Sequence, residues 1–354
     1  MVLNLLKTLI SIDSSTIPGA NEAVEFCGNW LKSHGMEVNF LENNGRKMLV
    51  TEVGSGEFTL VLNGHVDIVA GKHGQFFPYE SNGKLYGRGS ADMKAGVAAM
   101  MAAIVELKQY KLGIKVQLQI VSDEETGGEN CSGFLSESGY RGDFVICGEP
   151  TGLRIAIQAK GILRTDITVP GKSAHGSRPW EGINAIEQAY EIFKQIKDLR
   201  FAKESSEYYM HPSINLAKVA AGDAYNVVPD ECTIGLDIRY LPGQNPEEIL
   251  EQIKGISPEI SVVSGWQADP INTDPKHPFL NHLDRVIKRH PGRETVYFGQ
   301  HGSADTVYFA KHGIPAIEFG PSGANWHGDE EYVEIESVFA FRNILVELAT
   351  ELIF

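Results

Sequence analysis

The sequence has few cysteines, no long apolar run and a deficit of positive charge. Its four cysteines, Cys27, Cys131, Cys147 and Cys232, share no short paired spacing, which argues against a disulfide framework or a thiolate zinc site. No stretch approaches the roughly 20 apolar residues of a membrane span. The net charge of -15 argues against a general affinity for nucleic acid or anionic membranes. We therefore expect a cytoplasmic protein without nucleic-acid or membrane partners.

Length and composition are those of a globular protein. At 354 residues, two domains are favoured, although one large α/β unit is an alternative. Hydrophobic residues make up 42% and charged residues 22%, which excludes disordered and fibrous classes. Residues 1–10 have the apolar spacing of an amphipathic helix, with Lys7 among them, rather than that of a signal peptide.

The first part of the chain alternates helix and strand patterns. We expect helices over residues 22–34 and 93–107, the latter buried, and strands over 47–52, 59–62, 115–121 and 144–147. This alternation predicts an α/β fold, with a mixed, mostly parallel sheet covered by helices on both faces. A helix over 279–289, a strand over 316–319 and a helix over 335–352 would complete that domain.

The middle of the chain has a different pattern. Strands are expected over residues 163–169, 215–220 and 232–240, and helices over 184–199 and 246–253, the second opening after Asn245. The order strand, helix, strand, strand, helix, strand is that of a ferredoxin-like α+β sandwich. We therefore predict a catalytic domain of residues 1–162 and 270–354, interrupted by an inserted domain of residues 163–269.

Imidazole and acidic side chains follow several predicted strands. His65 and Asp67 share one side of an extended segment, so Asp67 would orient the His65 ring if that ring bound a metal. Asp92 follows a glycine-rich loop, which would bring its carboxylate close to an ion. The alternative for Asp92 is an N-cap on the helix that starts at Met93.

Glu124 and Glu125 form an adjacent carboxylate pair. In an extended chain they point to opposite sides, so one can bind metal while the other acts on a bound water. An exposed acidic loop is the alternative. Glu149, after an apolar strand, and His327, late in the chain, are two further candidates. Each residue alone is more typical of a structural role, but together they favour a metal site.

The order of these motifs resembles a dinuclear-zinc family that includes acetylornithine deacetylases, succinyl-diaminopimelate desuccinylases, aminoacylases and glutamate carboxypeptidases. The resemblance covers nearly the whole chain. Its motifs are residues 64–67 (GHVD), 87–96 (GRGSADMKAG), 123–128 (DEETGG), 148–151 (GEPT) and His327.

This resemblance implies roles for six residues. Asp92 would bridge two divalent ions, with His65 and Glu149 completing the site of one ion. Glu125 and His327 would complete the site of the other, and Glu124 would be the general base. Histidine and carboxylate ligands suit Zn²⁺, while Co²⁺ and Mn²⁺ stay open.

The inserted segment contains further candidates by the same resemblance. His175 would reach a neighbouring subunit's active site and stabilise an oxyanion, which implies a homodimer formed through a lid and dimerisation domain. Arg239, on the polar side of its strand, would grip a substrate carboxylate, with a surface ion pair as the alternative. Asn226 resembles a substrate-binding asparagine.

The implied activity is hydrolysis of the amide bond of an N-acyl amino acid. An acetyl- or succinyl-type deacylation in arginine or lysine biosynthesis is expected from the resemblance. A carboxypeptidase or dipeptidase with the same metals is the alternative, and a non-catalytic binding protein of this fold is a third. Gly302 and Ser303 lie where relatives hold the substrate, but residues 299–305 (GQHGSAD) depart from the usual Gly-Thr-Ser-Asp pattern, which leaves the substrate open.

Overall fold

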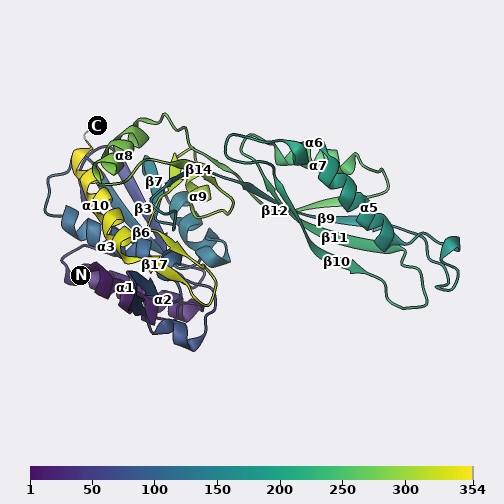
Figure 1. Cartoon of the computed structure of the whole chain (residues 1–354), viewed down its shortest axis with the longest axis horizontal. Helices are drawn as coiled ribbons and strands as arrows, with labels where there is room; N and C mark the ends of the chain where they lie inside the picture. Colours follow the sequence, from purple (N-terminus) through teal and green to yellow (C-terminus); the bar gives the residue numbers. More distant parts are fainter. Residues whose placement is uncertain (353–354) are drawn as a thin grey trace. The chain divides into compact units, whose positions relative to one another are not determined.

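The computed structural model describes residues 1–352 and divides the chain into two compact units (Figure 1). Unit 1 contains residues 1–157, 273–298 and 304–352, and unit 2 contains residues 158–272 and 299–303. Unit 2 is therefore longer at both ends than the segment 163–269 predicted from the sequence, and it also includes residues 299–303 from later in the chain. Each unit is described by itself.

The larger sheet of residues 1–352 is mixed and has nine strands in the order β1-β2-β6-β3-β7-β15-β8-β13, with β14 paired to β8. Most of it belongs to unit 1, whereas β13 falls within unit 2 and β8 and β14 cross the boundary between the units. The strands are β1 (Asn39–Asn43), β2 (Arg46–Gly54), β3 (Thr59–His65), β6 (Lys115–Val121), β7 (Phe144–Cys147), β8 (Ile155–Ala159), β13 (Ile271–Asn272), β14 (Tyr297–Gln300) and β15 (Ala316–Glu318). The central strands β6, β3, β7 and β15 run parallel. The strands that flank them are antiparallel in the pairs β1-β2, β2-β6, β15-β8 and β8-β13. The prediction of a mostly parallel sheet was therefore wrong for these outer strands.

Helices cover both faces of this sheet, as predicted (Figure 1). They are α1 (Val2–Ser11), α2 (Ile17–Ser33), α3 (Ala95–Leu107), α4 (Phe134–Glu137), α8 (Pro278–Arg289), α9 (Thr306–Ala310) and α10 (Ile335–Glu351). On one face, Gly64 of β3 leaves room for Met93, which lies just before α3, and for Val97 and Met100 of α3. On the other face, Val61 packs with Phe309 of α9. The central strands are thereby buried on both sides.

The alternation of polar and apolar residues in β6 does not mark an exposed face. Gln117 and Gln119 are buried, at 7% and 0% exposure. The Gln119 amide donates to Gln117 Oε1 at 2.9 Å and to the Tyr140 carbonyl at 2.8 Å. Asn63 of β3 donates to Gln119 Oε1 at 3.3 Å. Buried polar side chains are tolerated here because they satisfy one another.

A small antiparallel sheet of unit 1 was not predicted. Its order is β16-β17-β5-β4, formed by β4 (Tyr79–Ser81), β5 (Lys84–Tyr86), β16 (Gly323–Ala324) and β17 (Tyr332–Glu334). These strands have two or three residues each, too short for a clear alternation. The pairing of β17 with β5 places the segment between β16 and β17, which carries His327, beside the loop that follows β5.

Unit 2 has a four-stranded antiparallel sheet of order β10-β11-β9-β12. Its elements are β9 (Gly161–Pro170), α5 (Ala185–Asp198), α6 (Arg200–Lys203), β10 (Ser213–Ala221), β11 (Glu231–Tyr240), α7 (Pro246–Lys254) and β12 (Ser261–Ala268). Asn184 and Asn245 cap α5 and α7, accepting from Ile186 N and Glu247 N. The core joins Phe193 and Ile253 of the helices to the buried side of the sheet. This connectivity is ferredoxin-like.

Two structural findings bear on the predicted environment. Among residues 1–352, no helix combines the length and the apolar character that a membrane crossing requires. All four cysteines are buried and free.

Candidate metal centre

His65 stands at the carboxyl end of β3 and is 1% exposed. Its Nδ1 lies 2.9 Å from the Asp67 carbonyl oxygen and 3.5 Å from Asp67 Oδ1. The shorter contact assigns the Nδ1 hydrogen to the carbonyl. Nε2 then faces the other candidate ligands, which is the orientation that a metal-binding imidazole needs.

The Asp67 carboxylate holds the turn that carries the two glutamates. Its Oδ1 accepts from Glu124 N at 3.2 Å, and its Oδ2 accepts from Glu125 N at 3.0 Å. The two glutamates begin a 3₁₀ turn, Glu124–Thr126, and not an extended segment. Successive residues of such a turn still point in different directions, about 120° apart. Asp67 therefore orients His65 through its main chain and the glutamate turn through its side chain.

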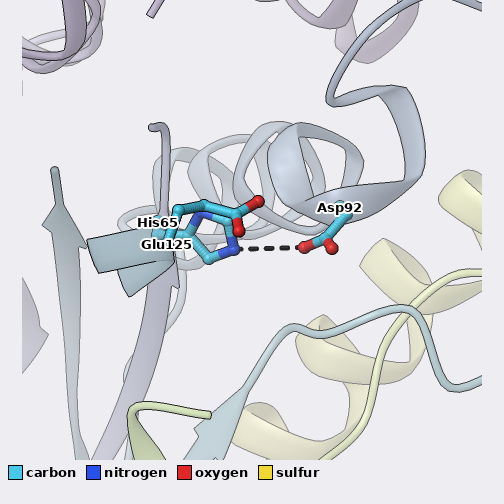
Figure 2. Close-up of side chains that lie close together, drawn as sticks. All are labelled: His65, Asp92 and Glu125. Atoms are coloured by element: carbon cyan, nitrogen blue, oxygen red, sulfur yellow. Dashed lines mark hydrogen bonds and ion pairs between the residues drawn. The ribbon is translucent and has the colours of Figure 1, made fainter. Parts of the chain in front are cut away.

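Asp92 lies between two histidines. Its Oδ1 is 3.2 Å from His65 Nε2, and its Oδ2 is 3.3 Å from His327 Nε2. Figure 2 shows the Asp92 carboxylate directed at the His65 ring. The capping alternative does not hold, because α3 begins at Ala95 and Lys94 occupies its N-cap position.

Glu149 and Glu125 contact different histidines. Glu149, which follows β7, places its Oε1 3.8 Å from His65 Nε2. Glu125 places its Oε1 3.2 Å from His327 Nε2. Glu124 reaches toward His65, with Oε2 3.9 Å from Nε2. The six residues thus form a His65 group and a His327 group that share Asp92.

Burial and charge shift the pKa values in this cluster. Burial raises the pKa of Glu124 and of Glu149 well above the ordinary value, partly offset by His65. The hydrogen bond with Asp92 and the charge of Glu125 raise the pKa of His327 to about 9, against some desolvation. Burial alone would lower the pKa of His65, but Asp67, Asp92 and the nearby glutamates raise it well above its usual range. The site concentrates negative charge that cations would balance.

The donor set fits divalent metal ions. His65, Asp92 and Glu125 each offer a ligand atom, and these atoms all lie within 4.8 Å of one another. Ligand atoms about 2.0–2.2 Å from a tetrahedral Zn²⁺ lie about 3.3–3.6 Å apart. The separations of 3.2–3.3 Å from the histidine nitrogens to Asp92 and Glu125 are close to that spacing, and the 3.8 Å from His65 Nε2 to Glu149 Oε1 is slightly longer.

Two buried groups near the centre escaped the sequence reasoning. Arg88 and Glu331 form an ion pair beneath Asp92. Arg88 stood in the glycine-rich motif, and Glu331 in an acidic run that resembles an exposed loop. The second group is Asp305, which accepts from Ser132 Oγ at 2.6 Å. Burial raises the pKa of Asp305 to about 7.

Two candidates of unit 2, His175 and Asn226, come together from separate loops. Gly176 N donates to the Asn226 carbonyl at 2.7 Å, and His175 forms an antiparallel bridge with Val227. His175 Nδ1 accepts from Ser177 N at 3.1 Å. The neutral His175 ring therefore has its hydrogen on Nε2.

The other candidates of unit 2 have simpler surroundings. Arg239 donates from Nε to Asp237 Oδ1 at 2.6 Å and from Nη2 to Oδ2 at 3.3 Å, so it takes part in the ion pair that was its alternative. Gly302 is exposed and Ser303 half-buried, in the segment that returns to unit 2.

Sequence comparisons identify relatives over most of the chain. A sequence profile described as Peptidase family M20/M25/M40 matches residues 61–351. An acetylornithine deacetylase of Pasteurella multocida is 34% identical over 262 residues, which cover 70% of this chain and 68% of the relative. The acetylornithine deacetylase of Proteus mirabilis is 32% identical over 254 residues, covering 68% and 66%.

Solved structures share the fold along nearly the whole chain. The aminopeptidase PepT of Bacillus cereus has a TM-score of 0.85 at 19% identity, covering 99% of this chain and 97% of that one. A tripeptidase of Staphylococcus aureus has a TM-score of 0.81 at 22% identity, with the same coverage. The YXEP protein of Bacillus subtilis, described as a dinuclear metal binding peptidase, has a TM-score of 0.75 at 16% identity, covering 99% and 96%.

Proposed function

Because this chain belongs to peptidase family M20/M25/M40 and is a hydrolase, we propose that it cleaves the amide bond of an N-acyl amino acid at a two-ion centre. The observation that carries this proposal is the position of Asp92, whose two oxygens face two histidines 3.2 and 3.3 Å away. His65 and Glu149 would hold one ion, and Glu125 and His327 the other. Zn²⁺ suits these ligands, with Co²⁺ or Mn²⁺ as alternatives.

In this proposal Glu124 is the general base. Bound divalent ions would lower the pKa of a shared water and polarise the scissile carbonyl. Glu124 would take the proton of that water and return it to the departing amine. Its main-chain N–H is held by Asp67, so its carboxylate starts from a fixed turn beside the ligands. Glu125, one residue on, is directed to His327 instead.

A deacylase is favoured over a peptidase by the sequence relatives. The two relatives at 34% and 32% identity are acetylornithine deacetylases, whereas the peptidases among the solved structures, at 16–22% identity, support the fold alone. We therefore propose acetyl- or succinyl-amino acids as substrates, in arginine or lysine biosynthesis. Asn226, Arg239, Gly302 and Ser303 would contact the substrate, and Arg239 would first have to leave Asp237.

A substrate panel tests this assignment. Metal-loaded protein would be given N-acetylornithine, N-succinyl-diaminopimelate, dipeptides and tripeptides, with release of free amine as the readout. We expect cleavage of an acylated amino acid at a kcat/KM at least a hundredfold above that of the peptides. Cleavage of peptides alone would replace the deacylase with the peptidase alternative. No cleavage of any amide by protein that holds two ions would contradict the catalytic proposal.

We also propose that unit 2 is a lid and mediates a homodimer, with His175 completing the partner's site. The support is a set of exposed apolar side chains in α5 and in the loop before it, Trp180, Ile183 and Tyr190, which are 75%, 49% and 58% exposed. Strand β10 is also an open edge of its sheet. Light scattering at micromolar concentration should give twice the chain mass of 38.9 kDa. A fully active monomer would contradict this proposal.

The reducing compartment expected from the sequence has one structural support. A cytoplasmic enzyme keeps its cysteines as thiols. All four cysteines are free and buried, which accords with that environment.

A further inference from the structure

A buried ion pair lies behind the candidate metal centre in unit 1. Arg88 Nη1 is 2.9 Å from Glu331 Oε2, and the two side chains are only 4% and 1% exposed. Arg88 belongs to the loop before Asp92, and Glu331 to the segment that follows His327. Isolating two charges from water is costly unless their remaining hydrogen bonds are satisfied. The other contacts of both side chains therefore indicate what the pair is for.

Glu331 fixes the main chain of the loop that ends at Asp92. Its Oε2 also accepts from Gly89 N at 2.9 Å, and its Oε1 accepts from Ala91 N at 3.0 Å and from Asp92 N at 3.1 Å. With Arg88, the carboxylate therefore accepts four hydrogen bonds, about as many as its oxygens can take. Gly89 has a φ of +73°, a conformation that suits glycine and permits this tight turn.

Arg88 fixes the main chain at His327. Its Nη2 donates to the His327 carbonyl at 3.1 Å. His327 has a φ of +60°, which is uncommon for a residue with a side chain and has to be held by its surroundings. The Glu331 carbonyl accepts from Gly87 N at 3.1 Å. Arg88 and Glu331 thus connect the loop of Asp92 to the segment of His327 in both directions.

We propose that Arg88 and Glu331 form a positioning clamp that sets the separation between Asp92 and His327 and thereby decides whether the ion on the His327 side is held. This inference rests on the proposed two-ion centre. His65 comes from β3 and Glu149 follows β7, and within residues 1–352 neither forms a hydrogen bond or ion pair with Arg88 or Glu331. Both groups share Asp92, but the His327 group depends on the clamp at Asp92 and at His327, so loss of the clamp should weaken the His327 group more than the His65 group.

Metal stoichiometry tests the clamp without reference to activity. The variants are Glu331→Gln, which removes the charge and turns a donor toward backbone N–H groups, and Arg88→Met, which removes both guanidinium bonds. The metal-free proteins would be dialysed against buffered Zn²⁺ and the bound metal measured by mass spectrometry. We expect two ions per unmodified chain and about one per variant chain, with a 10- to 100-fold weaker second site, the usual effect of losing residues that orient ligands.

A control variant comes from the same segment. Lys72 pairs with Asp329, two residues after His327, but these side chains are 73% and 63% exposed. Lys72→Met should leave two ions bound with unchanged affinity, because exposed pairs contribute little. Arg88→Lys keeps the charge and should give an intermediate loss. Thermal unfolding of the metal-free proteins shows whether each variant folds. If Arg88→Met or Glu331→Gln does not fold, Arg88→Lys still tests the clamp.

The outcomes separate the clamp from the proposed function. Two ions bound with unchanged affinities in folded Glu331→Gln and Arg88→Met would overturn the clamp and leave the function standing. Equal weakening of both sites in folded variants would also overturn it, since the proposed effect is greater on the His327 side. An unmodified protein that binds no divalent ion would overturn the proposed function, and the clamp with it.

Discussion

Replacing Glu124 with glutamine should remove the chemistry while keeping the metal centre. Glutamine has nearly the shape of glutamate but cannot accept a proton from water. The Glu124 carboxylate lies 3.9 Å from His65 Nε2, farther than any proposed ligand of that group. Its main-chain N–H stays bonded to Asp67 whichever side chain follows. We therefore expect the turn and its neighbour Glu125 to keep their positions.

The expected loss is that of a general base. Proton transfer by a positioned side chain contributes about 10²- to 10⁴-fold to rate. At about 1.4 kcal/mol for each factor of ten, this loss is about 3–5 kcal/mol of transition-state stabilisation. It should be seen in kcat, because a base acts in the transition state, while KM changes little. Burial raises the pKa of Glu124, so a base of this kind also predicts activity that falls as the pH drops through that pKa.

The matched variant is Glu125→Gln, one residue along the same turn. Glu125 Oε1 is 3.2 Å from His327 Nε2, so its loss should lower the metal content first and the activity as a consequence. Steady-state kinetics and metal analysis of both variants, side by side, separate a base from a ligand. If Glu124→Gln keeps more than a tenth of the wild-type kcat, or loses metal as Glu125→Gln does, the assignment of the two glutamates is wrong.

Three further predictions follow from the surroundings of individual side chains. The pKa of His327 is raised to about 9 and that of His65 is also raised, so both rings should lose protons when metal binds at pH 7. The metal affinity should therefore fall as the pH drops. Calorimetry would measure the binding enthalpy in buffers of different ionisation enthalpy, and equal enthalpies in all buffers would contradict this proton release. Burial lowers the pKa of Lys94 to about 7, so between that value and about 10.5 the unfolded chain binds more protons. The stability that Lys94 contributes is thus present at high pH and lost as the pH falls through about 7, and the unfolding free energy changes by at most about 1.4 kcal/mol per pH unit. Urea unfolding of Lys94→Met should lack this pH dependence. The same pH dependence in the unmodified protein and in the variant would refute the prediction. Phe144 is fully buried and stacks on Phe279 with ring centroids 3.9 Å apart. Replacing Phe144 with alanine should lower the unfolding free energy by about 3–5 kcal/mol, and a measured loss below about 1 kcal/mol would contradict this.

The convergence of the candidate ligands could be predicted because it depends on strand direction. His65 ends β3, the glutamate turn follows β6, and Glu149 follows β7. These three strands are parallel neighbours, so their carboxyl ends meet at one edge of the sheet. An alternation of strand and helix in the sequence is sufficient to predict that edge. The antiparallel strands at the sides carry no such signal, which explains why the sheet is less parallel than expected.

The residues that hold the candidate ligands in place could not be predicted from local sequence patterns. Glu331 accepts a hydrogen bond from the main chain of Asp92, which lies 239 residues earlier in the sequence. The residues just before Glu331 in the sequence are acidic, as in an ordinary exposed loop. The short strands β5 and β17 bring the two segments together, yet three residues are too few to show a period. By contrast, the pairing of Arg239 with Asp237 was accessible. Residues two apart in a strand share a face, so the two opposite charges were bound to be neighbours.

The adjacency of Glu124 and Glu125 matters less than the residue that holds them. An extended chain would separate the two side chains by alternation, but this segment is a 3₁₀ turn. The separation comes instead from Asp67, whose two oxygens bind the two successive amides and fix the turn relative to His65. One carboxylate is then directed toward His65 and the next toward His327. The division between a proposed ligand and a proposed base is therefore a property of the turn and of Asp67, which anchors it, and a Glu-Glu pair without an equivalent of Asp67 would not imply it.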